Sequence, residues 1–287
     1  MGKIMITGAT GQLGGAVIDA LLTRVEPTRV VALVRDKQKT GELIGRGIEV
    51  READYFDSSA LQAAFVGIDT LYLVSAVAFT DRLAQHRNVI EAARHADVRH
   101  LFYPSIQRID DERAPIDGVT DSDIATEHLL KASGLSYTIL KHPLYAEELP
   151  KFLGAALQGF SVPAGDGRIA LTSRLDLAEG AAVLLSGTGH ENREYILNAG
   201  QTYSFQELAE ALSRLSGKPV TYDALSSEAF IDSRISAGWP PAAARFVEAW
   251  FFAIRNGSFD EPSPTLAALL NRPPKGLDSI LNDAFFS

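Results

Sequence analysis

The sequence lacks cysteine and long apolar runs, and each absence excludes a class of protein. Without cysteine, the 287-residue chain can form no disulfide, thiol nucleophile or thiolate metal site, which fits a reducing compartment. No run of about 18 apolar residues occurs, so the sequence predicts no transmembrane helix. The N-terminus leads directly into a predicted strand, without a charged leader and apolar segment, and we expect a cytoplasmic protein that does not bind membranes.

Clustered cations and clustered histidines are also missing. The 27 lysines and arginines are outnumbered by 36 acidic residues, which gives a net charge of −9. No basic cluster is long enough to follow a phosphate backbone, so nucleic acid is not an expected partner. The six histidines are scattered, with no carboxylate at ligand spacing beside them, and we predict no metal site.

Apolar runs alternate with helical patterns through the first half of the chain. Continuous runs such as residues 30–34 are typical of parallel strands that helices cover on both faces. Strands are predicted at residues 3–7, 30–34, 48–50, 71–74, 100–103 and 136–140. Helices are predicted after the first strand and at residues 58–65, 81–96 and 121–132. This alternation predicts an α/β fold, a Rossmann-like doubly wound parallel sheet flanked by helices.

A glycine-rich turn joins the first predicted strand to the first predicted helix. Gly8, Gly11 and Gly14 allow the tight turn, let backbone N–H groups approach a pyrophosphate, and let the helix pack closely on the strand. The pattern by itself is weak, because many strand-to-helix turns favour glycine. In an alternating α/β chain it predicts a dinucleotide site.

The end of the second predicted strand indicates which dinucleotide binds. Arg35 stands about twenty residues after the last glycine, where such sites meet the adenine ribose. NAD sites favour a carboxylate there, whereas a guanidinium suits a 2′-phosphate. Lys37 and Lys39 follow Arg35, and we predict NADP(H) over NAD(H). Asp36, next to Arg35, could instead bind the 2′-hydroxyl of NAD(H). The alternative to either cofactor role is a solvated loop of mixed charge.

The tips of the third and fourth predicted strands supply further candidates. Asp54 could bond the adenine amino group and Tyr55 could flank the ring, while the alternative is a cap for the helix that begins at Ser58. Ser75 and Ala76 would lie along the nicotinamide ribose, because ligands of open α/β sheets bind at the carboxyl ends of strands. Small residues at that place are equally typical of a tight turn.

Beyond Pro143 the pattern changes to short strands and many helices. We predict a dinucleotide-binding domain at residues 1–148, to which residues 176–200 return, and a smaller, mostly helical substrate or lid region at residues 149–287. Ser204 and Glu207 form a capping-box pattern that opens a helix to about Leu215. Other elements are predicted as helices at 176–185, 227–237, 241–254, 264–270 and 277–285, and as strands at 193–197 and 219–222.

The ordered set of motifs resembles the NmrA-like branch of the atypical short-chain dehydrogenases/reductases over essentially the whole chain. The motifs are TGATGQLG at 7–14, VR at 34–35, ADY at 53–55, QHRNVI at 85–90, SGLSYTIL at 133–140, AGDGRI at 164–169, GHEN at 189–192 and SRLSGK at 213–218. Within that branch the sequence is similar to bacterial NAD(P)H:quinone reductases and triphenylmethane dye reductases. The resemblance implies that Thr10, Gly11, Gln12 and Leu13 hold the pyrophosphate, that Arg35 binds the 2′-phosphate, and that Asp54–Tyr55 lie beside the adenine.

The catalytic pair of the wider superfamily is absent. Short-chain dehydrogenases usually carry a Tyr and a Lys four residues apart on the helix after the fifth strand. The corresponding segment here reads DIATEH at 123–128. Tyr137 and Lys141 match the spacing but fall on the sixth predicted strand, where four residues span about 13 Å instead of about 6 Å on a helix. We therefore predict no carbonyl reduction through an activated tyrosine.

These observations together predict an NADPH-dependent oxidoreductase that transfers hydride to quinones or similar conjugated, aromatic acceptors. Such acceptors are already electrophilic, so positioning and exclusion of water supply most of what the reaction needs. The residues predicted near the nicotinamide are Tyr103, Ser105, His142, Pro143 and Tyr145. Packing or capping is favoured over proton donation for His142. Pro104 and residues 141–143 depart from the pattern of the similar reductases, which leaves the choice of substrate open.

Two other functions are compatible with parts of this pattern. A non-catalytic, NADP(H)-sensing regulatory protein of the NmrA type is the alternative function, and a nucleotide-sugar epimerase is disfavoured by the missing Tyr/Lys pair.

The predicted helix at 244–254 carries Phe246, Trp250, Phe251 and Phe252, too many aromatics for one narrow stripe. It could wall an aromatic-substrate pocket, form a homodimer contact, or be a core helix, and we favour the last.

Overall fold

A computed structural model describes residues 2–76 and 80–286, which form two compact units. The first, called here the sheet unit, comprises Met1–Ser105, Ser122–Lys141 and Leu175–Ile196. The second, called the helical unit, comprises Ile106–Asp121, His142–Arg174 and Leu197–Ser287. No helix among the described residues combines the length and the apolar character needed to cross a membrane.

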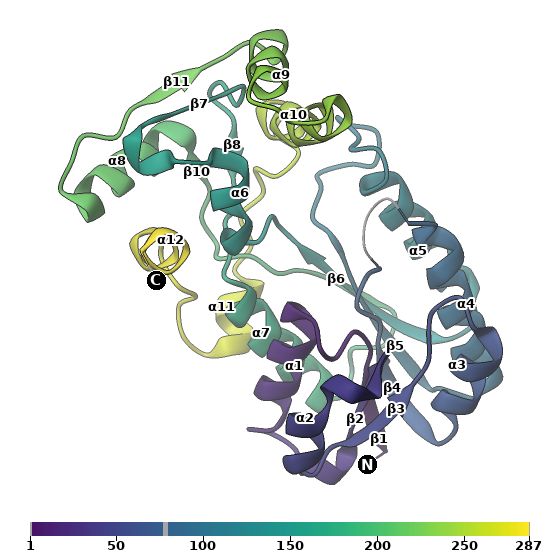
Figure 1. Ribbon diagram of the computed structural model, residues 1–287. Coiled ribbons are helices and arrows are strands. Elements are labelled where there is room, and N and C mark those ends of the chain that lie inside the picture. Colours follow the sequence, from purple (N-terminus) through teal and green to yellow (C-terminus); the bar gives the residue numbers. More distant parts are fainter. Residues whose placement is uncertain (1, 77–79, 287) are drawn as a thin grey trace. The chain divides into compact units, whose positions relative to one another are not determined.

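A seven-stranded sheet is the centre of the sheet unit (Figure 1). Its strands are β1 (Lys3–Ile6), β2 (Val30–Val34), β3 (Glu49–Glu52), β4 (Ile68–Tyr72), β5 (His100–Ile106), β6 (Ser136–His142) and β9 (Arg193–Ile196). The spatial order is β3-β2-β1-β4-β5-β6-β9, and the pairs β3–β2, β2–β1, β1–β4, β4–β5 and β6–β9 run parallel. Strand order reverses between β1 and β4, which is where open α/β sheets bind ligands.

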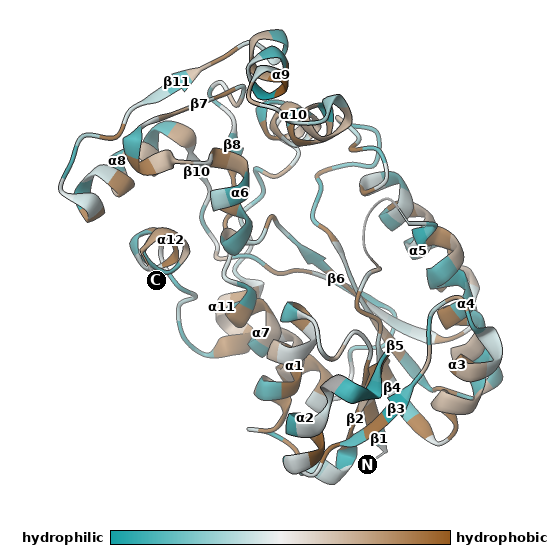
Figure 2. Cartoon of the chain, in the orientation of Figure 1, coloured by the Kyte–Doolittle hydropathy of each residue, from teal (hydrophilic) through white to brown (hydrophobic). Residues whose placement is uncertain are grey.

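Helices cover both faces of this sheet. Figure 1 shows α3 (Ser58–Phe65), α4 (Arg82–His95) and α5 (Thr120–Ala132) along one face, and α1 (Gln12–Leu21), α2 (Gly41–Gly45) and α7 (Arg174–Ser186) on the other. All five residues of β2 are buried, as expected for a central strand between two helical layers. The edge strand β3 is largely hydrophilic instead, as its teal colour in Figure 2 shows, and charged residues protect such an edge.

Side chains from the sheet and from α3 and α4 form the core of the sheet unit. Met5 and Leu33 from the central strands pack with Phe65 of α3 and Val89 of α4, and Leu101 of β5 belongs to the same buried cluster. Each of these side chains is at most 1% exposed, so the sheet and its helices form one close-packed body. The predicted Rossmann-like fold is confirmed by this architecture.

The helical unit has its own core and two small sheets. Strand β7 (Phe160–Val162) pairs with β11 (Tyr222–Ala224), and β8 (Arg168–Ile169) pairs with β10 (Tyr203–Ser204). Its helices are α6 (Leu149–Leu153), α8 (Phe205–Ser216), α9 (Ser227–Ser236), α10 (Pro241–Arg255), α11 (Thr265–Leu270) and α12 (Leu277–Phe285). The predicted capping box is confirmed: Ser204 accepts from the Glu207 nitrogen, and Glu207 accepts from the Ser204 nitrogen.

The aromatic helix α10 belongs to the core of the helical unit. Phe251 is fully buried and makes edge contacts with the rings of Phe152 and Phe205, while Trp250 stacks on Phe259 with ring centroids 5.7 Å apart. Phe252 faces outward and is 43% exposed. The prediction of a core helix is therefore confirmed.

Candidate functional site

The glycine turn between β1 and α1 is built as a close contact between strand and helix. Gly8 adopts a φ of +55°, a left-handed conformation that favours glycine. A Cβ atom on Gly14 would lie 2.3 Å from the carbonyl oxygen of Gly8, closer than any real contact. Only glycine at position 14 allows α1 to start this near β1, so the strand and the helix N-terminus reach the ligand edge together.

The N-terminus of α1 is left available for an anion. Gly11 is the N-cap residue, and no described side chain caps this end of the helix. The first turn holds no acidic residue, so its peptide N–H groups and the positive end of the helix dipole have no built-in negative partner. Thr10, Gly11 and Gln12 are exposed at this point, while Leu13 is buried beneath them. A pyrophosphate fits the donors that this turn presents.

The loop after β2 separates the two charges on which the choice of cofactor depends. Arg35 directly follows the strand and is exposed. The carboxylate of Asp36 accepts from the backbone nitrogen of Gln38 at 2.8 Å, where it caps a short 3₁₀ turn over Lys37–Lys39. Asp36 is thus engaged within its own loop, which favours the 2′-phosphate over the 2′-hydroxyl as the group recognised here. The side chain of Lys39 lies outside the described residues.

Asp54 and Tyr55 follow β3 at the same edge of the sheet. Asp54 is exposed and accepts from the Phe56 nitrogen at 2.8 Å. The alternative role of Asp54 as the cap of the next helix is wrong, because Asp57 caps α3 by accepting from the Ala60 nitrogen at 2.9 Å. Phe56, directly after Tyr55, is 55% exposed.

The Tyr55 hydroxyl ties three strand tips together. It donates to the Val74 carbonyl oxygen at 2.9 Å and lies against the hydroxyl of Thr7. Burial raises the pKa of Tyr55 above its usual value, against the opposing effects of the Thr7 contact and the Arg35 guanidinium. The hydroxyl is thus engaged within the protein, and the half-buried ring is the part of Tyr55 that could flank an adenine.

Ser75 and Ala76 are held from two directions at the tip of β4. The Ser75 hydroxyl donates to the Pro104 carbonyl oxygen at 3.1 Å. The Ala76 backbone N–H donates to Nε2 of His86 at 2.9 Å. His86 was not predicted at the site, because nothing in a scattered set of histidines indicates that this one meets a strand tip ten residues earlier in the chain.

Tyr103 and Ser105, which we predicted beside the nicotinamide, are enclosed within the sheet unit. Tyr103 is fully buried, and its hydroxyl donates to Asp123 of α5 at 2.5 Å. Burial and the Asp123 carboxylate raise the pKa of Tyr103 well above its usual value. The Ser105 hydroxyl donates to Glu127 at 2.5 Å. Both hydroxyls are engaged by buried carboxylates, and the place of Tyr103 and Ser105 beside the nicotinamide stays a prediction.

The helix after β5 carries two carboxylates in place of the superfamily's Tyr and Lys. Asp123 and Glu127, four residues apart on α5, are both buried. Arg82 donates to Asp123 at 2.6 Å. Tyr137 and Lys141 lie on β6, as predicted, and the Lys141 ammonium is 3.2 Å from Glu194 and 3.9 Å from Glu127. Lys141 serves an ion-pair network and is no partner for a catalytic tyrosine.

His142, Pro143 and Tyr145 belong to the helical unit. Nδ1 of His142 is 3.3 Å from the Tyr145 hydroxyl, and the Arg174 guanidinium lies over the Tyr145 ring at 4.9 Å. Burial lowers the pKa of His142 to about 3, so the imidazole is neutral near pH 7. A neutral, buried imidazole supports the packing role over proton donation. Pro143 is buried directly after β6.

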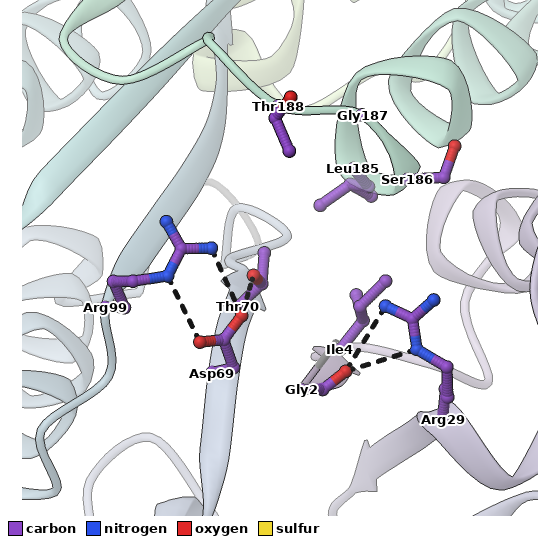
Figure 3. Close-up of a pocket in the computed structure, with 10 residues that line it drawn as sticks. All are labelled: Gly2, Ile4, Arg29, Asp69, Thr70, Arg99, Leu185, Ser186, Gly187 and Thr188. Carbon is purple, nitrogen blue, oxygen red and sulfur yellow. Dashed lines mark hydrogen bonds and ion pairs between the residues drawn. The ribbon is translucent and has the colours of Figure 1, made fainter.

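A hollow of about 250 Å³ within the sheet unit lies at the wrong edge of the sheet for a dinucleotide. Gly2, Arg29, Asp69 and Arg99 line it at the amino ends of β1, β2, β4 and β5, whereas the glycine turn follows a carboxyl end. Figure 3 shows that its two arginines already have partners: Arg29 donates to the Gly2 carbonyl oxygen, and Arg99 to both Asp69 oxygens. The candidate cofactor site is therefore at the opposite edge, which the glycine turn faces.

A doubly wound sheet with a glycine turn leading into an uncapped helix defines the class of Rossmann-like dinucleotide-binding proteins. The chain belongs to the NmrA-like family, whose model matches residues 1–268. Quinone oxidoreductase 2 of Escherichia coli (strain K12) is 39% identical over 285 residues, which cover 98% of this chain and 98% of that protein.

Two solved structures with bound cofactor are similar to this chain over nearly its whole length. The crystal structure of the NADPH-dependent quinone oxidoreductase of E. coli complexed with NADPH has a TM-score of 0.92 at 37% identity, covering 98% of this chain and 99% of that chain. The Citrobacter sp. triphenylmethane reductase complexed with NADP(H) has a TM-score of 0.89 at 33% identity, covering 99% and 100%. The predicted resemblance to the NmrA-like family is confirmed.

Proposed function

We propose that the protein is an NADPH-dependent oxidoreductase that transfers a hydride to quinones or similar conjugated, aromatic acceptors. The observation that carries the proposal is the uncapped N-terminus of α1 behind the glycine turn, together with Arg35 beside an Asp36 that is engaged in its own loop. Full-length similarity to a quinone oxidoreductase and to a triphenylmethane reductase, both solved with this cofactor, supports the same conclusion.

The residues at the carboxyl edge of the sheet fit such a cofactor. The space that a Cβ on Gly14 would fill is needed for the close approach of α1 to β1, and the exposed residues 10–12 offer their backbone to a pyrophosphate. Arg35 supplies a cation for the 2′-phosphate, the Tyr55 ring flanks the adenine, and Ser75–Ala76 line the nicotinamide ribose. When bound, NADPH supplies the hydride from its dihydronicotinamide ring.

The protein's own part in the chemical step is positioning and exclusion of water. The hydroxyls of Tyr103 and Ser105 are engaged by buried carboxylates, and His142 is neutral, so no described group among these stands ready as a strong acid. A quinone tolerates this because it is electrophilic before any proton arrives, and solvent supplies the proton to the reduced oxygen. An unactivated ketone needs the acid at the same moment as the hydride, and we expect it to be a poor substrate.

Oxidation of NADPH in the presence of a benzoquinone tests the proposal. Purified protein should consume NADPH, followed by its absorbance, only when the quinone is added, and NADH should be a poorer donor. Measurable NADPH binding without turnover across a panel of quinones and triphenylmethane dyes would contradict the proposed oxidoreductase activity. That result would favour the NADP(H)-sensing alternative, whose own test is whether bound cofactor changes association with another protein. We also propose a homodimer contact on α10, where Phe252 is 43% exposed.

A further inference from the structure

His86 joins the tip of β4 to helix α5 through both of its ring nitrogens. Nε2 is 2.9 Å from the Ala76 backbone nitrogen, and Nδ1 is 2.9 Å from the Thr126 hydroxyl oxygen. The side chain is fully buried, and its ring meets the Tyr103 ring edge-on with centroids 5.5 Å apart. The imidazole is therefore enclosed, and both of its polar atoms are satisfied within the sheet unit.

The hydrogen-bond partners determine which nitrogen of His86 carries the proton. A backbone N–H can only donate, so Nε2 must accept from Ala76 through its lone pair. The Thr126 hydroxyl donates to the Ser122 carbonyl oxygen at 2.7 Å, so its oxygen accepts from Nδ1–H. The neutral tautomer with the proton on Nδ1 satisfies both contacts. Burial, aided by the nearby Arg82 guanidinium, lowers the pKa of His86 to about 3, so the ring stays neutral near pH 7.

A buried ion pair between α4 and α5 fixes the two helices that carry His86 and Thr126. Arg82 lies one turn before His86 on α4, and Asp123 lies one turn before Thr126 on α5. The Arg82–Asp123 ion pair, at 2.6 Å with both side chains buried, clamps α4 to α5 beside the His86–Thr126 contact. His86 therefore reaches Ala76 from a fixed point, and the strand tip is the part that is held.

Ala76, whose backbone N–H donates to His86, lies at the edge of the sheet where the cofactor is proposed to bind. It follows β4 at the carboxyl end of the sheet, beside the point where strand order reverses. With Ser75 also bound to Pro104, two consecutive residues are fixed to neighbouring elements through one side chain and one backbone N–H.

We propose that His86 is a positioning residue that, as the Nδ1-protonated tautomer, holds Ala76 in the conformation that binds the nicotinamide end of NADPH. The inference rests on the proposed function for the identity of the cofactor. His86 itself touches no cofactor: it acts by accepting one backbone N–H, which pre-orders the strand tip before binding. Its loss should therefore weaken binding of NADPH more than it slows the chemical step.

Leucine substitutions at two buried histidines separate positioning from simple packing. His86→Leu should raise the Kd for NADPH, measured by fluorescence titration, and its KM about tenfold, with kcat much less affected. The control is His100→Leu, because His100 is also buried and also contacts a threonine hydroxyl (Thr138, 2.8 Å), but lies at the amino end of β5. His100→Leu should lower thermal stability similarly and leave the Kd unchanged. Equal weakening of NADPH binding by both variants, or by neither, would overturn the proposal.

Two further measurements keep the inference testable if His86→Leu fails to fold. In His86→Gln the side-chain oxygen can still accept from Ala76, so most of the lost affinity should return. In the wild-type protein, ¹⁵N NMR of the imidazole should show the His86 proton on Nδ1, unchanged between pH 5 and 8. A proton on Nε2 would contradict the proposal. Neither measurement needs a quinone, so failure of the positioning role and failure of the proposed reaction give different results.

Discussion

At the scale of single residues, the choice of cofactor depends on two neighbours of opposite charge. Asp36 would be the natural partner of a 2′-hydroxyl, but its carboxylate accepts from the Gln38 nitrogen and is used within its loop. Arg35 is exposed next to Asp36. The Arg35 charge also acts on Tyr55, where it opposes part of the rise in pKa that burial causes. The cation is thus the group of this pair that is available to a ligand.

Replacement of Arg35 should separate the two nicotinamide cofactors. Arg35→Ala removes a charge-assisted contact with the 2′-phosphate, and we expect NADPH binding to weaken by on the order of 1.5–3 kcal/mol, roughly 10- to 150-fold in Kd. NADH binding should barely change. Lys37→Ala removes an exposed cation two residues away and serves as the control for general electrostatic attraction. If both cofactors weaken equally in Arg35→Ala, the assignment of the 2′-phosphate to this residue fails.

Single residues also mark the limit of what the sequence could predict. Candidates such as Arg35 and Ala76 could be proposed from the sequence because the end of a strand locates them. The contacts of His86 and Tyr103 could not be predicted, because their partners lie 40 and 20 residues away on α5. No local pattern tells which side chains meet across a sheet and its covering helices.

At the scale of elements, the β1–α1 turn depends on how closely a helix can start against a strand. Helices α3 and α12 have the predicted bounds: α3 begins after its Asp57 cap, and α12 follows from its apolar spacing. Helix α2 was not predicted, because five residues with a glycine at each end show no periodicity. The strand predicted at 219–222 lies instead at Tyr222–Ala224, where its partner β7 decides the register.

Two neighbouring glycines of α1 should respond to alanine in opposite ways. In Gly14→Ala the new Cβ would meet the Gly8 carbonyl oxygen at 2.3 Å, so we expect a loss of about 1–3 kcal/mol in the free energy of unfolding, together with weaker NADPH binding. In Gly15→Ala the Cβ would lie 3.6 Å from its nearest neighbour, and the better helix propensity should stabilise the protein by about 0.5–1 kcal/mol. Urea unfolding measures both, and destabilisation of similar size in the two variants would contradict the close-contact explanation.

At the scale of the whole molecule, buried neutral histidines link stability to pH. Burial lowers the pKa of His86 and of His142 to about 3 and that of His100 to about 4. The unfolded chain binds protons at these sites from about pH 6.5 downward, while the folded protein does not. Protons therefore favour unfolding, and stability is full above about pH 6.5 and falls as the pH drops toward 4.

The loss of stability at acidic pH should be measurable, and removing a buried histidine should reduce it. Each of the three histidines should cost on the order of 2 kcal/mol of stability at pH 5 relative to pH 7. Denaturant midpoints recorded across that range should fall steeply for the wild type and less steeply for His100→Leu, which removes one of the three sites. Parallel slopes in the wild type and in His100→Leu would contradict the linkage.

The pairing of β9 with β6 has a consequence for the order in which the protein is made. The last strand of the sheet is Arg193–Ile196, and it aligns with Thr138 to Lys141 across an interval in which the chain forms the segment His142–Arg174 of the helical unit. When only the first 150 residues have emerged from the ribosome, six of the seven strands are exposed, with the edge of β6 unpaired and without the helix α7. The nascent sheet therefore cannot close until residue 196 has emerged, and until then β6 is the edge at which a chaperone is most useful or a wrong partner most damaging.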